Sequence, residues 1–281
     1  MGLTGDPSIW DGAPPTPASI RLDGRTAVVT GAARGIGEAV AVALARFGAD
    51  VAICDREADD MAATARDIAA EGRAAITGEL DVRDDEAVAA FIAEVSDAFG
   101  SIDILVNNAG GGFNASFLDV STKGEQALIA ENFTSVTSFV RHTVPHMTAG
   151  GSIINVTSIE AHRAGPGFAI YSAMKAGVAS LSMSLSMELA ARRIRVNCIA
   201  VDVTPTPGDA VLADDSAAIS HDTWASQTWP EMGSVHDSAA AAVFLASDMS
   251  RFVTGSSLHV DGGNWAASGW KVNLDDGTFA L

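Results

Sequence analysis

The chain has 281 residues, of which 48% are hydrophobic, so it is long enough to bury one large α/β core. Its formal net charge of -18, from 35 acidic and 17 basic residues, would repel a phosphate backbone and argues against a nucleic-acid partner. No apolar run reaches the roughly 18 residues that a membrane span requires, and no basic segment followed by an apolar one opens the chain, so we expect a soluble, cytoplasmic protein.

Residues 1–22 are rich in proline and predict a weakly ordered arm before a single domain over residues 23–263. Short apolar segments then alternate with alanine-rich helical stretches, as is typical of a parallel sheet covered by helices on both faces. We therefore predict an α/β fold with a doubly wound, Rossmann-type sheet. Its seven strands are expected at residues 26–30, 51–55, 74–80, 104–106, 152–156, 194–199 and 257–260.

A glycine-rich turn over residues 30–37 joins the first strand to the first helix. Gly31 permits the tight turn, Gly35 lets the backbone approach a pyrophosphate, and Gly37 allows the helix to pack closely on the sheet. The helix N-terminus attracts the anion. Because a strand precedes this turn and a helix follows it, the segment predicts a dinucleotide site that includes Arg34 and Ile36.

The second strand ends at Asp55, whose carboxylate can bind both hydroxyls of an adenosine ribose and repel a 2′-phosphate. Arg34 and Arg56 favour the opposite choice, because guanidinium groups near the ribose could pair with that phosphate. We expect NAD as the cofactor, with NADP as the alternative. Asp55 could also act as a helix N-cap, which is compatible with cofactor binding.

The helical pattern between residues 122 and 148 is long and contains Pro145, which predicts a kink or a stop near its end. His142 and His146 have the spacing of a helical metal pair, but no third ligand is evident, so we predict no metal site. Cys54 and Cys198 lie in apolar segments and predict buried free thiols.

Tyr171 and Lys175 are four residues apart in a helical segment, which places a phenol and an ammonium on one face. A phenol alone titrates at about pH 10 and is a poor proton acceptor at neutrality. A nearby cation stabilises the phenolate and lowers the phenol pKa toward neutrality. The pair therefore predicts an acid-base catalyst, whereas the alternative is a surface helix with an exposed lysine.

Residues 204–235 lose the helical and strand periods and include Pro205, Trp224 and Trp229, which predicts a lid or binding loop. The tail over residues 264–281 carries further aromatic residues. This tail could cover a neighbouring subunit or its active site, or pack locally.

Four motifs occur in order: the glycine-rich turn, the segment 107–110 (Asn-Asn-Ala-Gly) after the fourth strand, Ser158 after the fifth, and Tyr171 with Lys175 on the next helix. Together they strongly resemble the short-chain dehydrogenase/reductase family, over residues 23–263. The resemblance implies an oxidoreductase that uses NAD(P) and acts on CH–OH groups. The segment 260–263 (Val-Asp-Gly-Gly) matches a subunit interface of relatives and implies a homo-oligomer, expected to be a tetramer.

The resemblance also implies roles for individual residues. Tyr171 exchanges a proton with the substrate oxygen, Lys175 lowers the phenol pKa and binds the nicotinamide ribose, and Ser158 hydrogen-bonds the substrate oxygen. The remaining matches are Asn132, which holds a water near the lysine; Asp81 and Val82, which contact adenine; Asn108, Ala109 and Gly110, which support the central strand and the cofactor; and Thr206, near the nicotinamide amide. One departure is Val201-Asp202, where the family has Pro-Gly.

Without the other motifs, Ser158 would read as a strand-end turn residue and Asn132 as a polar residue within a helix. The expected substrate is a hydrophobic secondary alcohol or ketone, such as a steroid or terpenoid, because the predicted loop and tail are rich in aromatic side chains. A 3-oxoacyl thioester is the alternative, and sugar alcohols fit the tryptophans less well. The non-catalytic alternative is a dinucleotide-sensing binding protein or a scaffold.

Overall fold

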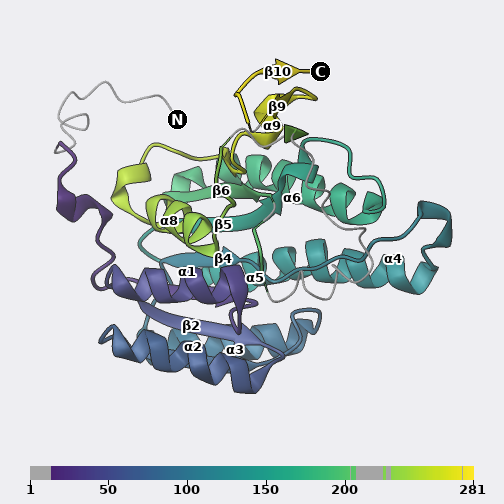
Figure 1. Ribbon diagram of the computed structural model, residues 1–281. Helices are drawn as coiled ribbons and strands as arrows, with labels where there is room; N and C mark the ends of the chain where they lie inside the picture. The colour runs from purple at the N-terminus through teal and green to yellow at the C-terminus, as the bar shows by residue number, and fades with distance from the viewer. Residues whose placement is uncertain (1–13, 203, 207–223, 226–228, 274) are drawn as a thin grey trace.

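The computed structural model describes residues 14–202, 204–206, 224–225, 229–273 and 275–281 (Figure 1). Seven parallel strands form the central sheet in the order β3-β2-β1-β4-β5-β6-β8, which confirms the predicted fold. From β1 to β3 successive strands are added toward one edge of the sheet, and from β4 onward they are added toward the other edge. In sheets of this kind, ligands bind in the crevice between the two strands where the order reverses, here β1 and β4. The strands are β1 (Thr26–Thr30), β2 (Asp50–Asp55), β3 (Ala75–Glu79), β4 (Ile104–Asn107), β5 (Gly151–Ser158), β6 (Ile194–Val201) and β8 (Ser257–Val260).

Helices cover both faces of this sheet (Figure 1). On one face lie α1 (Gly35–Arg46), α2 (Ala58–Ala70) and α8 (Val235–Ala246); on the other lie α3 (Asp85–Phe99), α5 (Ser135–Thr143) and α6 (Ala169–Glu188). The central strands are almost entirely buried, as expected for a parallel sheet covered on both faces. Because both faces of these strands are buried, their sequences are apolar at consecutive positions instead of alternating between apolar and polar residues.

The predicted long helix is divided into α4 (Thr122–Ile129), a π-helical turn η4 (Ala130–Thr134) and α5. The predicted stop is confirmed, because α5 ends at Thr143 and Pro145 lies in the short 3-10 turn η5 (Val144–His146). The π turn was not predicted, since a one-residue widening of a helix leaves no sequence period. Its consequence is local: it contains Asn132, one of the predicted site residues.

The described start of the chain reaches into the core of the domain. Residues 1–13 of the predicted arm lie outside the described residues, whereas Pro17–Ile20 form the 3-10 turn η2 and Leu22 is fully buried in the core. The core of the domain thus includes a residue that the sequence boundary assigned to the arm.

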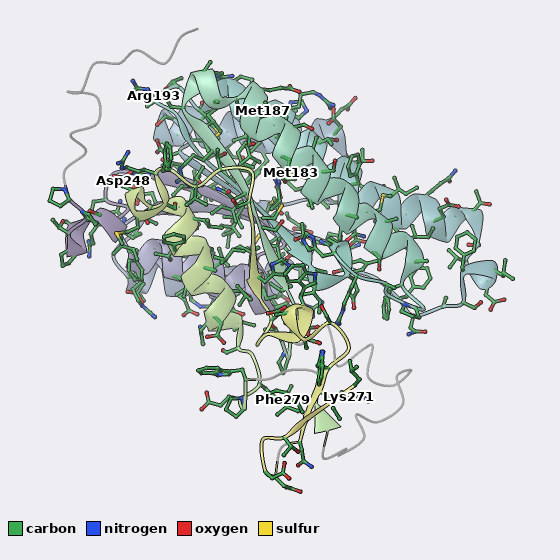
Figure 2. All side chains as sticks on the ribbon, turned by 90° about the horizontal axis from the view of Figure 1, so that it is seen from above. Met183, Met187, Arg193, Asp248, Lys271 and Phe279 are labelled. Atoms are coloured by element: carbon green, nitrogen blue, oxygen red, sulfur yellow. The ribbon has the colours of Figure 1, made fainter. Side chains whose placement is uncertain are left out.

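The C-terminal tail forms the short helix α9 (Asn264–Ala267) and the strands β9 (Lys271–Asn273) and β10 (Phe279–Ala280). These strands join β7 (Trp224–Ala225) in a small antiparallel sheet, which stands apart from the central sheet in Figure 2. Most of the predicted loop 204–235 lies outside the described residues. Trp224 and Ala225 of this loop, which form β7, pair with strand β9 of the tail. Within one chain, the tail packs on the loop that the sequence predicted to cover the substrate.

Three further features bear on the sequence predictions. Cys54 and Cys198 are buried and free, as predicted. His142 lies 3.2 Å from the carboxylate of Asp85, and the described residues contain no group of three potential metal ligands. None of the helices in the described part of the chain has the length and apolar character of a membrane span.

Burial of Leu22 makes the start of the domain testable. Leu22→Ala should lower the free energy of unfolding by about 2–5 kcal/mol, because it leaves a cavity in a close-packed core. Leu281→Ala, at a side chain that is 85% exposed, is the matched control and should leave the midpoint of urea unfolding unchanged. Equal midpoints for both variants would show that the core begins after residue 22.

Candidate active site

The predicted dinucleotide turn lies at the carboxyl end of β1, beside the end of β4. Gly31 and Gly35 have φ angles of +64° and +65°, a backbone region that favours glycine. A Cβ on Gly31 would lie 2.8 Å from Cα of Ala109, and one on Gly37 would lie 2.1 Å from the carbonyl oxygen of Gly31. Both glycines are therefore required by close approach of the backbone, and the N-terminus of α1 is left open to an anion.

The segment after β4 is bonded directly to this turn. The side-chain amide of Asn108 donates to the carbonyl oxygens of Thr30 and Gly31, at 3.0 and 2.9 Å. The Thr30 hydroxyl oxygen accepts from the backbone N–H groups of Asn108 and Ala109, each at 3.0 Å. A Cβ on Gly110 would lie 2.8 Å from Oδ1 of Asn132 and 3.2 Å from Nζ of Lys175. This segment connects the cofactor turn to the predicted catalytic residues.

Asp55 lies at the end of β2 and braces the same turn. Its Oδ2 atom accepts from the backbone N–H of Ala33 at 3.0 Å, and Oδ1 accepts from the N–H groups of Arg56 and Glu57. It is not the N-cap of α2, which begins after Glu57. Carboxylate oxygens have further lone pairs, so these bonds leave acceptor capacity for ribose hydroxyls.

The two arginines that favoured NADP each lie near an acidic side chain. Arg34 is 3.9 Å from a carboxylate oxygen of Asp60, and Arg56 is 3.9 Å from one of Glu131. Both guanidinium groups are about half exposed, so these pairs contribute little stability. The positive charge of each guanidinium is nevertheless partly balanced by the neighbouring carboxylate, which reduces its attraction for a phosphate group.

Asp81, just beyond β3, accepts hydrogen bonds from Arg83 on both carboxylate oxygens. These bonds lower the pKa of Asp81 to about 2. Sequence reasoning missed Arg83, although a basic residue two positions from an acid in a turn was visible. Val82 is half-buried against the core, and Thr206, also half-buried, lies beyond the end of β6.

The predicted catalytic pair lies on α6. Nζ of Lys175 is 5.5 Å from the centroid of the Tyr171 ring and donates to the carbonyl oxygen of Val156 at 3.0 Å. The lysine is buried, and desolvation lowers its pKa to about 8. It is thus mostly charged at neutral pH while lying beside the phenol, which is the arrangement that the spacing predicted.

Asn132 is fully buried in the π turn, and its side chain is committed to the backbone. Its amide nitrogen donates to the carbonyl oxygens of Gly111 and Leu128, at 2.8 and 3.0 Å, and its Oδ1 accepts from the N–H of Gly111. The side chain therefore fixes the loop after β4 next to Lys175. The sequence alone could not show that this residue turns inward.

Ser158 is the last residue of β5 and is buried. Its hydroxyl donates to Oε2 of Glu160 at 2.9 Å, and its oxygen accepts from the backbone N–H of Glu160 at 3.2 Å. Sequence reasoning missed Glu160. An acid two residues after a strand-end serine was its only signal, and that pattern is common in turns.

The departure at Val201-Asp202 has a structural counterpart. The side chain of Asp202 is 10% exposed, accepts a hydrogen bond from Asn264, and lies 3.8 Å from the guanidinium of Arg163. Arg163 in turn donates to Oδ1 of Asn264 at 3.0 Å and lies 3.8 Å from Glu160. The tail is thereby tied to the end of β6 and to the segment after Ser158.

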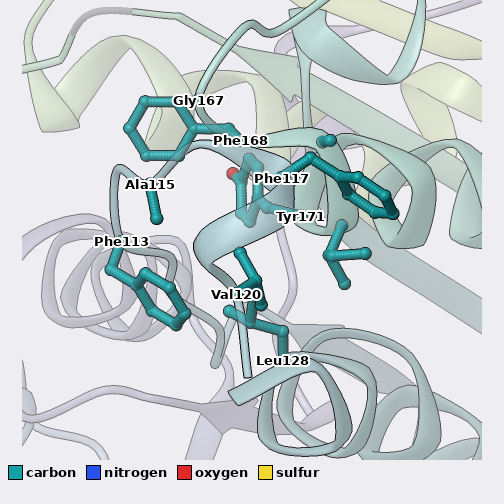
Figure 3. A pocket seen from close by; sticks show the side chains of 10 residues that line it. Phe113, Ala115, Phe117, Val120, Leu128, Gly167, Phe168 and Tyr171 are labelled. Carbon is teal, nitrogen blue, oxygen red and sulfur yellow. The ribbon is translucent and has the colours of Figure 1, made fainter. Parts of the chain in front are cut away.

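An apolar pocket opens beside Tyr171 (Figure 3). Its free volume of about 10 Å³ is close to what one water molecule needs, so a ligand must displace side chains to enter it. Phe113 and Phe117 are 41% and 62% exposed, and neither lies in a regular strand or α-helix. The remaining walls come from Ala115, Val120, Leu128, Gly167, Phe168, Ala169, Ile170 and Tyr171.

Comparison with known proteins agrees with this geometry. The family model described as enoyl-(acyl carrier protein) reductase matches residues 31–264. The chain is 38% identical to an uncharacterised oxidoreductase of Mycobacterium tuberculosis, over 86% of this chain and 93% of the relative.

Two solved structures are similar along most of their length. One is carveol dehydrogenase from Mycobacterium avium in complex with NAD, with a TM-score of 0.78 and 32% identity over 88% of this chain and 99% of that one. The other is a gluconate 5-dehydrogenase from Burkholderia cenocepacia in complex with NADP and tartrate, with a TM-score of 0.81 and 36% identity over 89% and 98%. Similar structures thus hold either dinucleotide.

The lowered pKa of Lys175 predicts a pH dependence of stability in the protein without cofactor. Between about pH 8 and 10.5 the unfolded chain binds a proton that the folded chain does not, so the free energy of unfolding should rise with pH. Relative to Lys175→Met, wild type should gain on the order of 2–3 kcal/mol across this window. Urea unfolding at several pH values measures the difference, and parallel curves for the two proteins would contradict the lowered pKa.

Proposed function

The chain belongs to the short-chain dehydrogenase/reductase family and is an oxidoreductase that acts on CH–OH groups rather than a binding or scaffold protein; from this premise we propose that it transfers a hydride between NAD(H) and a hydrophobic secondary alcohol or ketone. The observation that carries the proposal is the buried, mostly charged Lys175 lying 5.5 Å from the ring of Tyr171. A phenol held beside an ammonium can exchange protons near neutral pH.

In the proposed mechanism, Tyr171 accepts the proton of an alcohol, or gives one to a ketone oxygen. Lys175 stabilises the phenolate and reaches the nicotinamide ribose, and Ser158 contacts the substrate oxygen. Asn132 holds the loop after β4 and, through its backbone, a water that connects Lys175 to solvent. A bound nicotinamide supplies the hydride acceptor or donor at its C4 atom.

The dinucleotide would lie along the carboxyl ends of β1 and β4, with its pyrophosphate at Gly31, Gly35, Ile36 and Gly37. Adenine would lie near Asp81 and Val82, and Thr206 near the nicotinamide amide. Asn108 and Ala109 would support the cofactor turn through their bonds to Thr30 and Gly31, and Gly110 would contribute to the cofactor site as the next residue of the loop.

NAD is the proposed dinucleotide, and NADP is the alternative. Asp55 keeps a carboxylate at the end of β2, where it would repel a 2′-phosphate. The acids beside Arg34 and Arg56 reduce the attraction of both arginines for that phosphate. Relatives of this fold bind either dinucleotide, so the choice depends on this local charge balance.

A hydrophobic substrate is supported by the apolar pocket beside Tyr171, in which three phenylalanines contribute walls. The runner-up substrate is a 3-oxoacyl thioester, and one relative that is 34% identical to this chain is a 3-oxoacyl-[acyl-carrier-protein] reductase. An acidic carrier would meet a chain of net charge -18, so electrostatic repulsion argues against that alternative.

We also propose a cytoplasmic homo-oligomer, expected to be a tetramer. Met183 and Met187 lie on one stripe of α6 and are 54% and 81% exposed (Figure 2). Large apolar side chains exposed together on a helix are typical of an interaction surface. The two buried free thiols fit a reducing compartment.

The function is tested by following NADH during incubation with carveol, a 3β-hydroxysteroid, sorbitol and a 3-oxoacyl thioester. We expect turnover with the hydrophobic alcohols. Tyr171→Phe should lower kcat by about 10²- to 10⁴-fold, because the proton acceptor is removed. The affinity for NADH, measured by fluorescence titration, should stay unchanged. Turnover like that of wild type in this variant would remove Tyr171 from the mechanism.

The dinucleotide preference is tested at Asp55. Wild type should have a higher kcat/KM with NAD than with NADP. Asp55→Ala should lower the ratio of these two kcat/KM values by about tenfold, because the carboxylate that repels the 2′-phosphate of NADP is removed. Asp55→Asn removes the negative charge but keeps an acceptor oxygen for the N–H of Ala33. This variant therefore distinguishes the effect of the charge from the effect of the hydrogen bond to the turn. Asp97→Ala, at an exposed acid on α3, is the control. Equal wild-type efficiency with both dinucleotides would defeat the role of Asp55.

A further inference from the structure

We infer that Glu131 is a specificity-determining residue for the dinucleotide, because it holds the guanidinium of Arg56 and keeps it from pairing with the 2′-phosphate of NADP. The inference rests on the proposed function and deepens it, since it names a second determinant of the cofactor choice beside Asp55. Its basis is the ion pair between Glu131 and Arg56, together with the place of that pair at the carboxyl edge of the sheet.

The pair spans the crevice in which the dinucleotide would lie. Arg56 directly follows β2, and Glu131 lies in the π turn η4, one residue before Asn132. Oε1 of Glu131 is 3.9 Å from the guanidinium of Arg56, and a Cβ on Gly111, in the loop after β4, would lie 3.8 Å from the same atom. In the sheet, β1 lies between β2 and β4. The pair therefore connects the two sides of the crevice beyond the end of β1, where the glycine-rich turn begins.

Two neighbouring cations are committed to other groups. Arg83 donates to both carboxylate oxygens of Asp81, and Lys175 donates to a backbone carbonyl of β5. The charge of Glu131 acts on both cations less than their own surroundings do: the bond to Asp81 contributes most to raising the pKa of Arg83, and burial lowers the pKa of Lys175. Arg56, by contrast, lies at ion-pair distance from Glu131. The carboxylate therefore acts chiefly on Arg56.

The two dinucleotides differ in what they require of this pair. NAD carries a ribose hydroxyl near the end of β2, and it can bind while Arg56 stays with Glu131. NADP carries a phosphate there, which attracts a guanidinium strongly because the two groups form paired, charge-assisted hydrogen bonds. To make those bonds, Arg56 must leave Glu131, whose carboxylate then remains unpaired beside a second anion. This penalty applies to NADP alone, so the pair favours NAD.

The exposure of the pair sets the size of the effect. The side chain of Arg56 is 56% exposed and that of Glu131 is 25% exposed, so solvent screens their attraction and the pair adds little to the stability of the fold. Replacing Glu131 should therefore change the cofactor preference without unfolding the domain. Exposed ion pairs correspond to at most about a fivefold change in an equilibrium constant.

The test compares the dissociation constants of NADPH and NADH, measured by fluorescence titration of wild type and of Glu131→Gln at low ionic strength. Glutamine keeps the size of the side chain and removes its charge, which frees Arg56. We expect the ratio of the NADPH constant to the NADH constant to fall by about fivefold. Because both dinucleotides share the nicotinamide half, this ratio cancels any effect that the substitution has through Lys175.

A double-mutant cycle assigns the effect to Arg56. Arg56→Met should lower the affinity for NADPH by about fivefold in the Glu131→Gln background, and by much less in wild type, where the guanidinium is already held. If Glu131 instead repelled the phosphate directly, Glu131→Gln would raise the affinity for NADPH equally with and without Arg56. That result would contradict the inference.

Two further variants complete the experiment. Glu131→Ala also removes the charge and should shift the ratio in the same direction, which covers the case that the glutamine variant folds poorly. Glu125→Gln removes an equal charge at an exposed position of α4 and should leave the ratio unchanged. An unchanged ratio in both Glu131 variants, with NADH bound by wild type, would overturn the inference alone. Absence of NADH binding by wild type would overturn the proposed function and the inference with it.

Discussion

The site depends on one constraint, the burial of an ammonium group inside the domain. Lys175 loses most of its hydration, and the free energy of that desolvation is offset only in part by its bond to the carbonyl oxygen of Val156. Its charge is therefore retained by a small margin near neutral pH. A cation in this state interacts strongly with a neighbouring phenol, because little water screens the pair.

The surrounding fold is organised to keep that side chain in place. β5 supplies the Val156 carbonyl that accepts from the lysine, and two positions later the same strand ends at Ser158. The loop after β4 approaches the lysine so closely that Gly110 has no room for a side chain. Asn132, turned inward by the π helix, holds the next residue of that loop. Thus a strand, a loop and an irregular helical turn converge on one charged atom.

A second polar system lies next to Ser158 and Glu160. Asp202, Arg163 and Asn264 link the end of β6 to the beginning of the tail, and Arg163 faces the carboxylate that holds Ser158. The departure from the family pattern at residues 201–202 therefore has a structural consequence, because the carboxylate of Asp202 helps to hold the guanidinium of Arg163 in place. The tail, which pairs with residues 224–225 of the predicted loop, is connected through this cation and Glu160 to Ser158.

The sequence by itself determined the fold class, the seven strands, the stop at Pro145 and the spacing of Tyr171 with Lys175. These features depend on local periods and on the backbone limits of glycine and proline, which the residues carry with them. Only the tertiary structure decided the π turn that directs Asn132 inward, the bonds of Arg83 to Asp81, the hold of Glu160 on Ser158, and the pairing of the tail with the loop. Each of these depends on the direction of a side chain or on the meeting of distant segments. No local period records such a contact, because its energy arises only when the chain is folded.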